Sequence, residues 1–183
     1  MKVLFVEGAR KGGSTDKISC RLEEGLLKNG HETERVYLFG KQMNGCLGCN
    51  HCRNTDGTCV FKDDLPEVID KFMEADLIVL VSPVYFYSVT AQLKTFIDRT
   101  FAVEHRVKRK KMIFITSSMA PYTERQIPFL KTVENTYLGY VACFHGEVEN
   151  LGILGGWGTG TAYSRIEDHP VYDEAYELGL SIH

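Results

Sequence analysis

Residues 76–82, with the sequence DLIVLVS, decide the fold of this chain. Residues 77–81 are all apolar, so a strand formed by them has no polar face and must be buried on both sides. Strands of this kind occupy the middle of a parallel sheet that helices cover on both faces. Residues 2–7 (KVLFVE) and 111–116 (KMIFIT) have the same character, which predicts two more strands of that sheet.

Helical patterns fill most of the intervals between the strands. In residues 15–28 the side chains of Ile18, Leu22 and Leu26 recur at helical spacing, and Asn29-Gly30 ends the pattern. The alternation predicts an α/β fold with a single domain over residues 1–183. We expect a flavodoxin-like doubly wound sheet of five parallel strands, in the order 2-1-3-4-5, with helices on both faces. The other predicted elements are strands at residues 31–38 and 143–153 and helices at residues 63–75, 90–104, 123–138 and 170–181.

Composition places the chain among ordinary globular proteins. Of its 183 residues, 44% are hydrophobic and 25% are charged, and the net charge is −3. This charge gives no general attraction to nucleic acid or to an anionic membrane. No apolar stretch approaches the ~20 residues of a membrane span, and the first residues predict a strand rather than a signal peptide. We therefore expect a cytoplasmic protein that needs neither nucleic acid nor a membrane as its partner.

The loops after the first, third and fourth strands lie at the edge of the sheet where such folds bind ligands. The first loop, residues 8–15 (GARKGGST), contains three glycines and ends in two hydroxyl side chains where a helix begins. Free N–H groups and the helix dipole make that position suitable for a phosphate. The loop matches neither G-x-x-x-x-G-K-[ST] nor G-x-G-x-x-G, which argues against a nucleoside triphosphatase and a classical dinucleotide site. An ordinary strand-to-helix turn is the alternative.

Aromatic side chains follow the most buried strand directly. The loop of residues 82–89 (SPVYFYSV) contains two tyrosines and a phenylalanine at a position where they cannot enter the core. Such aromatics favour a flat ligand packed against them. The alternative is that they only cover the end of the sheet.

The run of residues 82–99, SPVYFYSVTAQLKTFIDR, resembles the second flavin loop and following helix of the NADPH-dependent FMN reductase and iron–sulfur flavoprotein family. The order of parts is similar too, with a glycine-rich loop, a cysteine-rich segment and then this motif. The resemblance covers about residues 1–120 well and the remainder loosely. The first loop departs from it, because members commonly have G-S-P-R where this chain has Gly8-Ala9-Arg10. The resemblance implies FMN as the cofactor and NAD(P)H as a transient co-substrate.

The same resemblance implies which residues contact the cofactor. Because a flavin carries the hydride chemistry itself, we assign no catalytic side chain. Asp98 and Arg99, on the helix after the second loop, are expected to form a surface or subunit contact. The implied cofactor-binding residues are Arg10, Ser14 and Thr15 for the phosphate, Pro83, Val84, Tyr85, Phe86 and Ser88 for the isoalloxazine ring, and Thr116, Ser117 and Ser118 for another edge of the flavin.

Four of the six cysteines crowd into one short segment with the pattern C-x2-C-x2-C-x6-C: Cys46, Cys49, Cys52 and Cys59. A disulfide scaffold spreads its cysteines through a small secreted chain, so this cluster indicates metal or redox chemistry in a reducing compartment. Closely spaced thiolates can hold a [4Fe–4S] cluster. The motif resembles the one that ligates the cluster in iron–sulfur flavoproteins. Tetrahedral zinc or free thiols are the alternatives.

The family resemblance implies an FMN-dependent NAD(P)H oxidoreductase that reduces a flavin, a quinone or another small acceptor. Electrons would enter from NAD(P)H or from a ferredoxin-like donor, and the assembly would be a homodimer or homotetramer. Two other classes are the alternatives. One is a non-enzymatic flavoprotein electron carrier that receives electrons from a ferredoxin-like donor, and the other is a redox sensor that uses the cysteines as a thiol switch.

Overall fold

The computed structural model describes residues 1–183 and contains a five-stranded sheet in the order β2-β1-β3-β4-β5. All the pairings are parallel. The central strands are β1 (Lys2–Glu7), β3 (Leu77–Pro83) and β4 (Lys110–Ser118), and the edge strands are β2 (Glu32–Tyr37) and β5 (Val148–Trp157). The predicted fold class and strand order are therefore confirmed.

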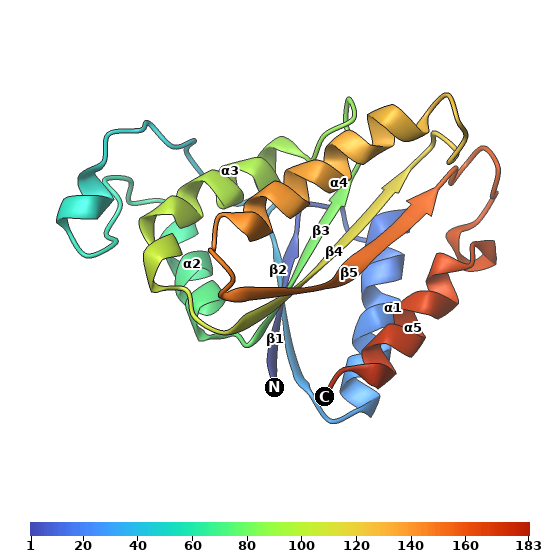
Figure 1. Cartoon of the computed structure of the whole chain (residues 1–183), viewed down its shortest axis with the longest axis horizontal. Helices are drawn as coiled ribbons and strands as arrows, with labels where there is room; N and C mark the ends of the chain where they lie inside the picture. The colour runs from blue at the N-terminus through green and yellow to red at the C-terminus, as the bar shows by residue number, and fades with distance from the viewer.

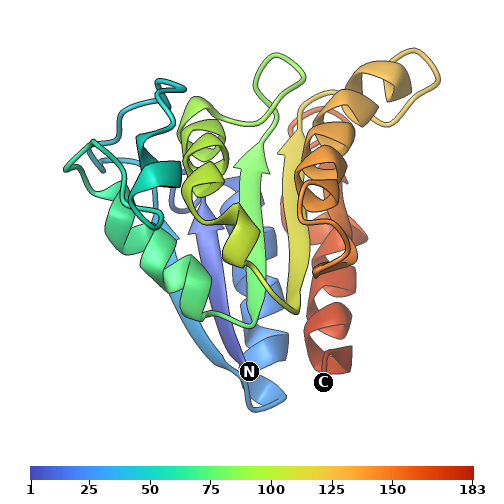
Figure 2. The ribbon, with the colours of Figure 1, turned by 60° about the vertical axis from the view of Figure 1, so that its left-hand side comes forward.

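The α-helices form one layer on each face of the sheet (Figures 1 and 2). One layer consists of α1 (Ser14–Lys28) and α5 (Val171–Ser181), and the other of α2 (Leu65–Glu74), α3 (Ala91–Arg99) and α4 (Ile127–Ala142). None of these helices is both long enough and apolar enough to cross a membrane.

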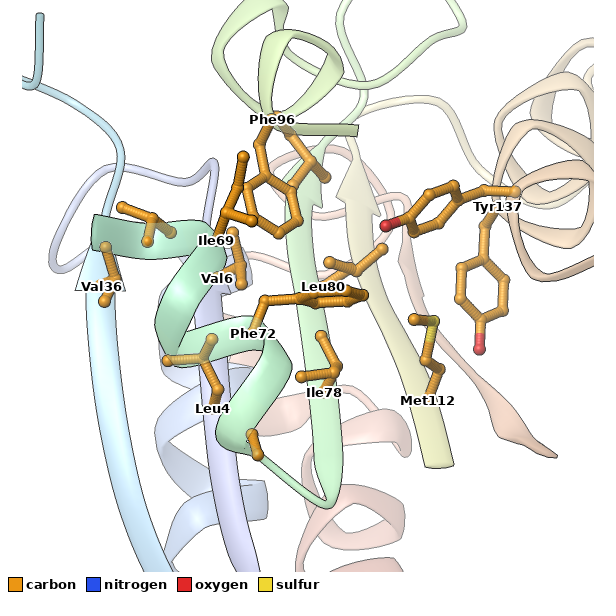
Figure 3. Packing of buried hydrophobic residues seen from close by; sticks show 14 of the residues in the cluster. Leu4, Val6, Val36, Ile69, Phe72, Ile78, Leu80, Phe96, Met112 and Tyr137 are labelled. Atoms are coloured by element: carbon orange, nitrogen blue, oxygen red, sulfur yellow. The ribbon is translucent and has the colours of Figure 1, made fainter. Parts of the chain in front are cut away.

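The core lies in two parts, one on each face of the sheet, because β1, β3 and β4 bury side chains on both faces. Phe72 of α2 is fully buried and meets the ring of Phe96 of α3 edge-on, with ring centroids 5.8 Å apart. Figure 3 shows both rings on the face of the central strand β3 that carries Ile78 and Leu80. A run of apolar residues without alternation is thus explained by helices packing on both sides of it.

Three elements have boundaries that differ by more than two residues from the sequence predictions. The helix predicted at residues 90–104 ends at Arg99 and continues as two short 3-10 turns. The Thr100 hydroxyl donates to the Ile97 carbonyl at 2.7 Å, a local bond of the kind that competes with helix continuation. The fourth helix begins at Ile127 with proline in its first turn, where the missing N–H costs nothing, and it continues to Ala142. The fifth strand consequently begins at Val148 rather than at residue 143.

Candidate functional site

A cleft of about 450 Å³ opens at the C-terminal edge of the sheet, where the loops after β1, β3 and β4 meet. Parallel strands end at the same edge, so loops far apart in the sequence come together there. All the residues predicted to contact a cofactor line this cleft except Ser88 and Thr116. The other lining residues are Ala9, Gly13, Met119 and Thr159.

The two exceptions, Ser88 and Thr116, lie outside the lining of the cleft. The backbone of Ser88 exchanges two hydrogen bonds with the backbone of Tyr85, at 2.9 and 3.0 Å, and so closes the turn between them. Thr116 is fully buried, and its hydroxyl has no hydrogen-bond partner. The sequence predictions did not include Thr159 because it follows β5. Ligands of this fold are expected at the loops after β1, β3 and β4. The glycine-rich run at residues 155–160 is the signal that pointed there; its Trp157 stacks on Tyr122 with ring centroids 5.9 Å apart.

One end of the cleft is formed by the N-terminus of α1. Gly13 occupies the N-cap position and no side chain caps the helix, so the first amide groups of α1 are left without a capping acceptor. The hydroxyl-bearing Ser14 and Thr15 lie in this first turn, and the side chain of Arg10 folds beside Gly13. Free amides, the helix dipole, hydroxyls and a cation together suit a phosphate group.

Hydrogen bonds tie the three loops to one another. The hydroxyls of Thr15 and Ser117 are 2.6 Å apart and buried, which joins the first loop to the third. The amide of Gly8 donates to the Val81 carbonyl at 2.7 Å, and the Thr90 hydroxyl donates to the Gly8 carbonyl at 3.0 Å. The first loop is therefore fixed to both neighbours, and the cleft is preformed.

A polar network on the side of the first loop away from the cleft holds the loop in place. Asp16 accepts hydrogen bonds from the Gly12 amide and from the Tyr37 hydroxyl, both at 2.7 Å. Burial, together with this bond to Asp16, raises the pKa of Tyr37, so its proton stays on the hydroxyl. Burial also raises the pKa of Glu7 to about 7, although a hydrogen bond from Ser19 and the charge of Arg35 oppose the shift. The shape of the first loop is thus held by groups that do not reach the cleft.

The aromatic loop after β3 is a tight two-residue turn with an unusual backbone. Phe86 and Tyr87 have φ values of +50° and +57°, a region that bulky side chains rarely adopt. The Tyr87 hydroxyl donates to the Gln126 side chain at 2.8 Å, and the Tyr87 ring packs on Phe129. Strain of this kind persists only where surrounding contacts hold it, and it concentrates at functional sites. The turn leaves Phe86 fully exposed and Tyr85 half-exposed at the cleft.

The chemistry of the lining separates into two ends. Arg10 and Tyr85 are the titratable side chains among the lining residues, and no carboxylate lies among them. The α1 end therefore suits an anion, and the end formed by Pro83, Val84 and the aromatic residues suits a flat apolar ring. An FMN molecule has a phosphate and a flat ring, and this donor set fits both.

The second candidate site is the cysteine loop (residues 45–62), which lies at one side of the molecule beyond α2 and α3 (Figures 1 and 2). None of its residues lines the cleft. Its four cysteines are free and border one small, largely apolar hollow together with Leu47, Val60, Phe61 and Phe101. No three metal-ligating side chains converge closely enough to hold a metal ion as they stand. The thiols fit the donor set of an iron–sulfur cluster by number and by sharing this hollow, and binding one requires them to draw together.

The prediction that Arg99 forms a surface or subunit contact is wrong. The side chain of this residue is 1% exposed and forms an ion pair with Asp63 inside the protein. Asp98, in contrast, is exposed and pairs with Lys94 on the surface of α3. The sequence could not separate the two neighbours, because their difference depends on a partner far away in the chain.

Protonation of His169 is expected to loosen the loop between β5 and α5. This loop contains Thr159, which lines the cleft. The Nδ1 of His169 accepts a hydrogen bond from the Val171 amide at 3.1 Å, and only a neutral imidazole can accept there. Burial lowers the pKa of His169, against an opposing hydrogen bond with the Trp157 backbone. A lowered pKa means that the folded state binds this proton more weakly, so the contribution to stability is present above pH ~6.5 and is lost below it.

NMR of the Val171 amide and limited proteolysis of residues 158–170, at pH 5 and pH 8, measure this effect. His169→Asn keeps an acceptor at the start of α5 but removes the titration, so its loop should respond equally at both pH values. An unchanged pH response in the Asn variant would show that another group is responsible.

Comparison with known proteins identifies relatives over the whole chain. The family described as NADPH-dependent FMN reductase matches residues 1–128. An iron–sulfur flavoprotein of Methanocaldococcus jannaschii is 33% identical over 185 residues, covering 100% of this chain and 95% of the relative. An iron–sulfur flavoprotein of Archaeoglobus fulgidus is 40% identical over 107 residues, covering 58% of this chain and 48% of that protein.

Solved structures share the fold at lower sequence identity. The NAD(P)H:quinone oxidoreductase from Methanothermobacter marburgensis superposes with a TM-score of 0.75 at 18% identity, covering 100% of this chain and 96% of that one. An FMN-dependent NADH-azoreductase from Bacillus anthracis, in complex with FMN, has a TM-score of 0.67 at 16% identity, with 97% of each chain covered. Apart from Thr159, every residue that lines the cleft lies within the segment that the family matches. The chain belongs to the NADPH-dependent FMN reductase family, a family of FMN-dependent NAD(P)H oxidoreductases.

Proposed function

We propose that the chain binds FMN in the cleft and passes electrons from NAD(P)H to a small acceptor such as a quinone or a free flavin. The observation that carries the proposal is the arrangement of the cleft, with the uncapped N-terminus of α1 at one end and the aromatic turn at the other. Membership of the family and the fold shared with quinone reductases and azoreductases support it.

The α1 end would hold the FMN phosphate. The amides of the first turn and the hydroxyls of Ser14 and Thr15 donate to phosphate oxygens, and Arg10 supplies a positive charge. The Gly12 amide is not available to the phosphate, because it donates to the carboxylate of Asp16; this hydrogen bond maintains the conformation of the loop. The hydrogen bond between Thr15 and Ser117 fixes the position of the phosphate end of the cleft relative to the third loop.

The loop from Pro83 to Phe86 would bind the isoalloxazine ring. Pro83 and Val84 give apolar walls, and the pinned turn holds Tyr85 and Phe86 at the mouth of the cleft, where they exclude water. Ser117 and Ser118 offer hydroxyls to a polar edge of the ring. When bound, FMN supplies the hydride and electron transfer, and the protein sets its position and surroundings.

Titration of the cofactor-free chain with FMN and with riboflavin tests the proposal, because riboflavin has the same ring and no phosphate. We expect FMN to bind at least ~100-fold more tightly, since two or more charge-assisted hydrogen bonds are lost with the phosphate. The FMN-loaded protein should then oxidise NAD(P)H when a quinone is added. Failure of both flavins to bind would refute the proposal, and binding without reduction by NAD(P)H would favour an electron carrier fed by a protein donor.

We further propose that Cys46, Cys49, Cys52 and Cys59 hold a [4Fe–4S] cluster, which would accept electrons from a ferredoxin-like donor. The shared hollow bordered by the four thiols supports this, as do relatives named iron–sulfur flavoproteins. Protein purified without oxygen should contain about four irons and four sulfides per chain. Replacing the four cysteines with serine should remove the iron and leave FMN binding unchanged, because the loop does not reach the cleft. One zinc and no sulfide would contradict the assignment.

We also propose that the chain assembles as a homodimer or homotetramer, which light scattering on the purified FMN-loaded protein measures directly. A mass equal to the 20.7 kDa chain would contradict this.

A further inference from the structure

The base of the cysteine loop is closed by a buried ion pair. The guanidinium of Arg99 donates from Nη1 and Nη2 to the two carboxylate oxygens of Asp63, at 2.9 and 3.2 Å. The side chains of the two residues are 1% and 5% exposed. Such a two-pronged contact fixes direction as well as distance, which a lysine in the same place does not do.

The same ion pair contacts both ends of the loop. Asp63 follows the loop directly, and Asn44 precedes it. Arg99 Nη1 donates to the Asn44 carbonyl at 2.9 Å, and the Asn44 amide donates to Asp63 at 2.8 Å. Just outside these two residues, the Asp64 amide donates a hydrogen bond to the Gln42 carbonyl at 3.0 Å. The two ends of the loop are therefore held together around one guanidinium.

A second attachment lies farther along the loop. Arg53, between Cys52 and Cys59, bonds to Glu104 and to the ring of His105, and its guanidinium lies 3.9 Å from the centre of the Phe101 ring. Residues 100–106 continue α3 as two 3-10 turns, so both attachments are made to the same continuous segment. At the other end of α3, the N-cap residue Thr90 donates a hydrogen bond to Gly8 in the first loop of the cleft. One rigid helix thus connects the cleft to the cysteine loop.

The energy of such a contact makes it sensitive to mutation. Removing one member of a buried ion pair leaves an unpaired buried charge, which costs more than removing both members. The pKa of Asp63 is lowered to about 2; burial opposes this shift, and the hydrogen bonds from Arg99 and Asn44 outweigh it. Its charge, and so the closed base, is retained at any pH above ~4 and is lost as the pH falls toward 2.

We propose that Arg99 is a positioning residue for the four thiols: by pairing with Asp63 it closes the cysteine loop at its base and holds the thiols on the end of α3. The inference rests on the proposed role of the cysteines as cluster ligands. A long loop that is open at its base samples many conformations, and four thiols must be brought together from all of them. With the base closed, the loop has already lost much of this conformational entropy when the protein folds, so less is lost when the thiols come together.

The test compares thiol reactivity in FMN-loaded, iron-free protein, read cysteine by cysteine with mass spectrometry. In Arg99→Met the partly buried Cys52 and Cys59 should be alkylated about tenfold faster, because the loop opens more often, whereas the exposed Cys46 and Cys49 should change little. Arg99→Lys should lie between this variant and the wild type. Cys20 on α1 is outside the loop and serves as an internal control whose rate should not change. Asp98→Asn removes an exposed ion pair of the same helix and is the matched control variant.

Iron loading gives the second measurement. After anaerobic reconstitution, Arg99→Met should retain at least ~3-fold less iron and sulfide than the wild type and than Asp98→Asn, while its affinity for FMN stays the same. Arg99→Lys should recover part of the loss. If Arg99→Met does not fold, two other variants test the same point by faster alkylation. The paired variant Asp63→Asn with Arg99→Met removes both charges, and Arg99→Lys keeps both charges but loses the two-pronged contact.

Two outcomes separate the inference from the proposed function. Unchanged loop alkylation in Arg99→Met and Arg99→Lys would overturn the positioning role, whatever metal the wild type holds. Faster alkylation of the loop cysteines alone, in a protein whose wild type retains no iron, would support the closed base and refute the cluster. A rise in the Cys20 rate to the same extent would show general unfolding and would also overturn the inference.

Discussion

Replacing Ser14 with aspartate is expected to weaken FMN binding by at least ~100-fold, because a carboxylate then faces the phosphate at the α1 end of the cleft. Ser14 is the first residue of α1 and lines the cleft. An acidic residue in the first turn of a helix is favourable to the helix dipole, so the fold should keep its stability. The variant thus separates binding from folding, which most loop substitutions do not.

Riboflavin provides the control for this variant, since it has no phosphate to repel. Its affinity should change by less than ~3-fold in Ser14→Asp, and Ser14→Ala should lower FMN affinity by only ~3- to 10-fold through the loss of one hydroxyl. Fluorescence quenching of the flavin measures all three. An equal loss of FMN and riboflavin affinity would indicate that the loop had been deformed, and undiminished FMN affinity would place the phosphate elsewhere.

The sheet and most of the cleft are predictable from the sequence because both depend on local signals. Apolar runs such as residues 77–81 can be satisfied only between two layers of helices, and right-handed crossovers place the carboxyl ends of the strands along one edge of the sheet. The ends of three strands then specify which loops meet. Ser14 and Tyr85 were reached in this way and Ser117 through the family resemblance, and the structure brings all three to one cleft.

The remaining features depend on contacts between distant residues, for which the sequence has no local signal. Arg99 and Asp98 are adjacent and both charged, and only the position of Asp63 makes one of them buried. The spacing of the cysteines indicates their chemistry but not their place, since the loop follows an edge strand and is free to pack on either side. Its position at the end of α3 is set by Arg53 and Arg99, which pair with residues about 50 and 36 positions away in the chain.

Gly25→Ala is expected to lower the free energy of unfolding strongly, because the backbones of α1 and α5 are in contact at this residue. The two helices lie side by side on one face of the sheet (Figures 1 and 2). A Cβ at Gly25 would lie 2.3 Å from the Tyr176 carbonyl oxygen, and one at Gly179 would lie 2.5 Å from the Leu22 carbonyl oxygen. Backbone atoms cannot rotate away as a side chain can, so the helices must separate and unpack the core beneath them.

We expect Gly25→Ala to lower stability by about 3 kcal/mol or more, which for a chain of this size corresponds to a fall of roughly 10 °C in Tm. Gly139 on α4 is the matched control, because a Cβ there meets nothing within 4 Å. Gly139→Ala should stabilise the protein by about 0.5–1 kcal/mol, since alanine is the better helix former. Thermal unfolding of both variants, without cofactor so that binding does not add to stability, gives the comparison. Opposite signs for the same substitution would show that the contact between the helices decides the outcome, whereas a Gly25→Ala variant no less stable than the wild type would mean that α1 and α5 are not packed this closely.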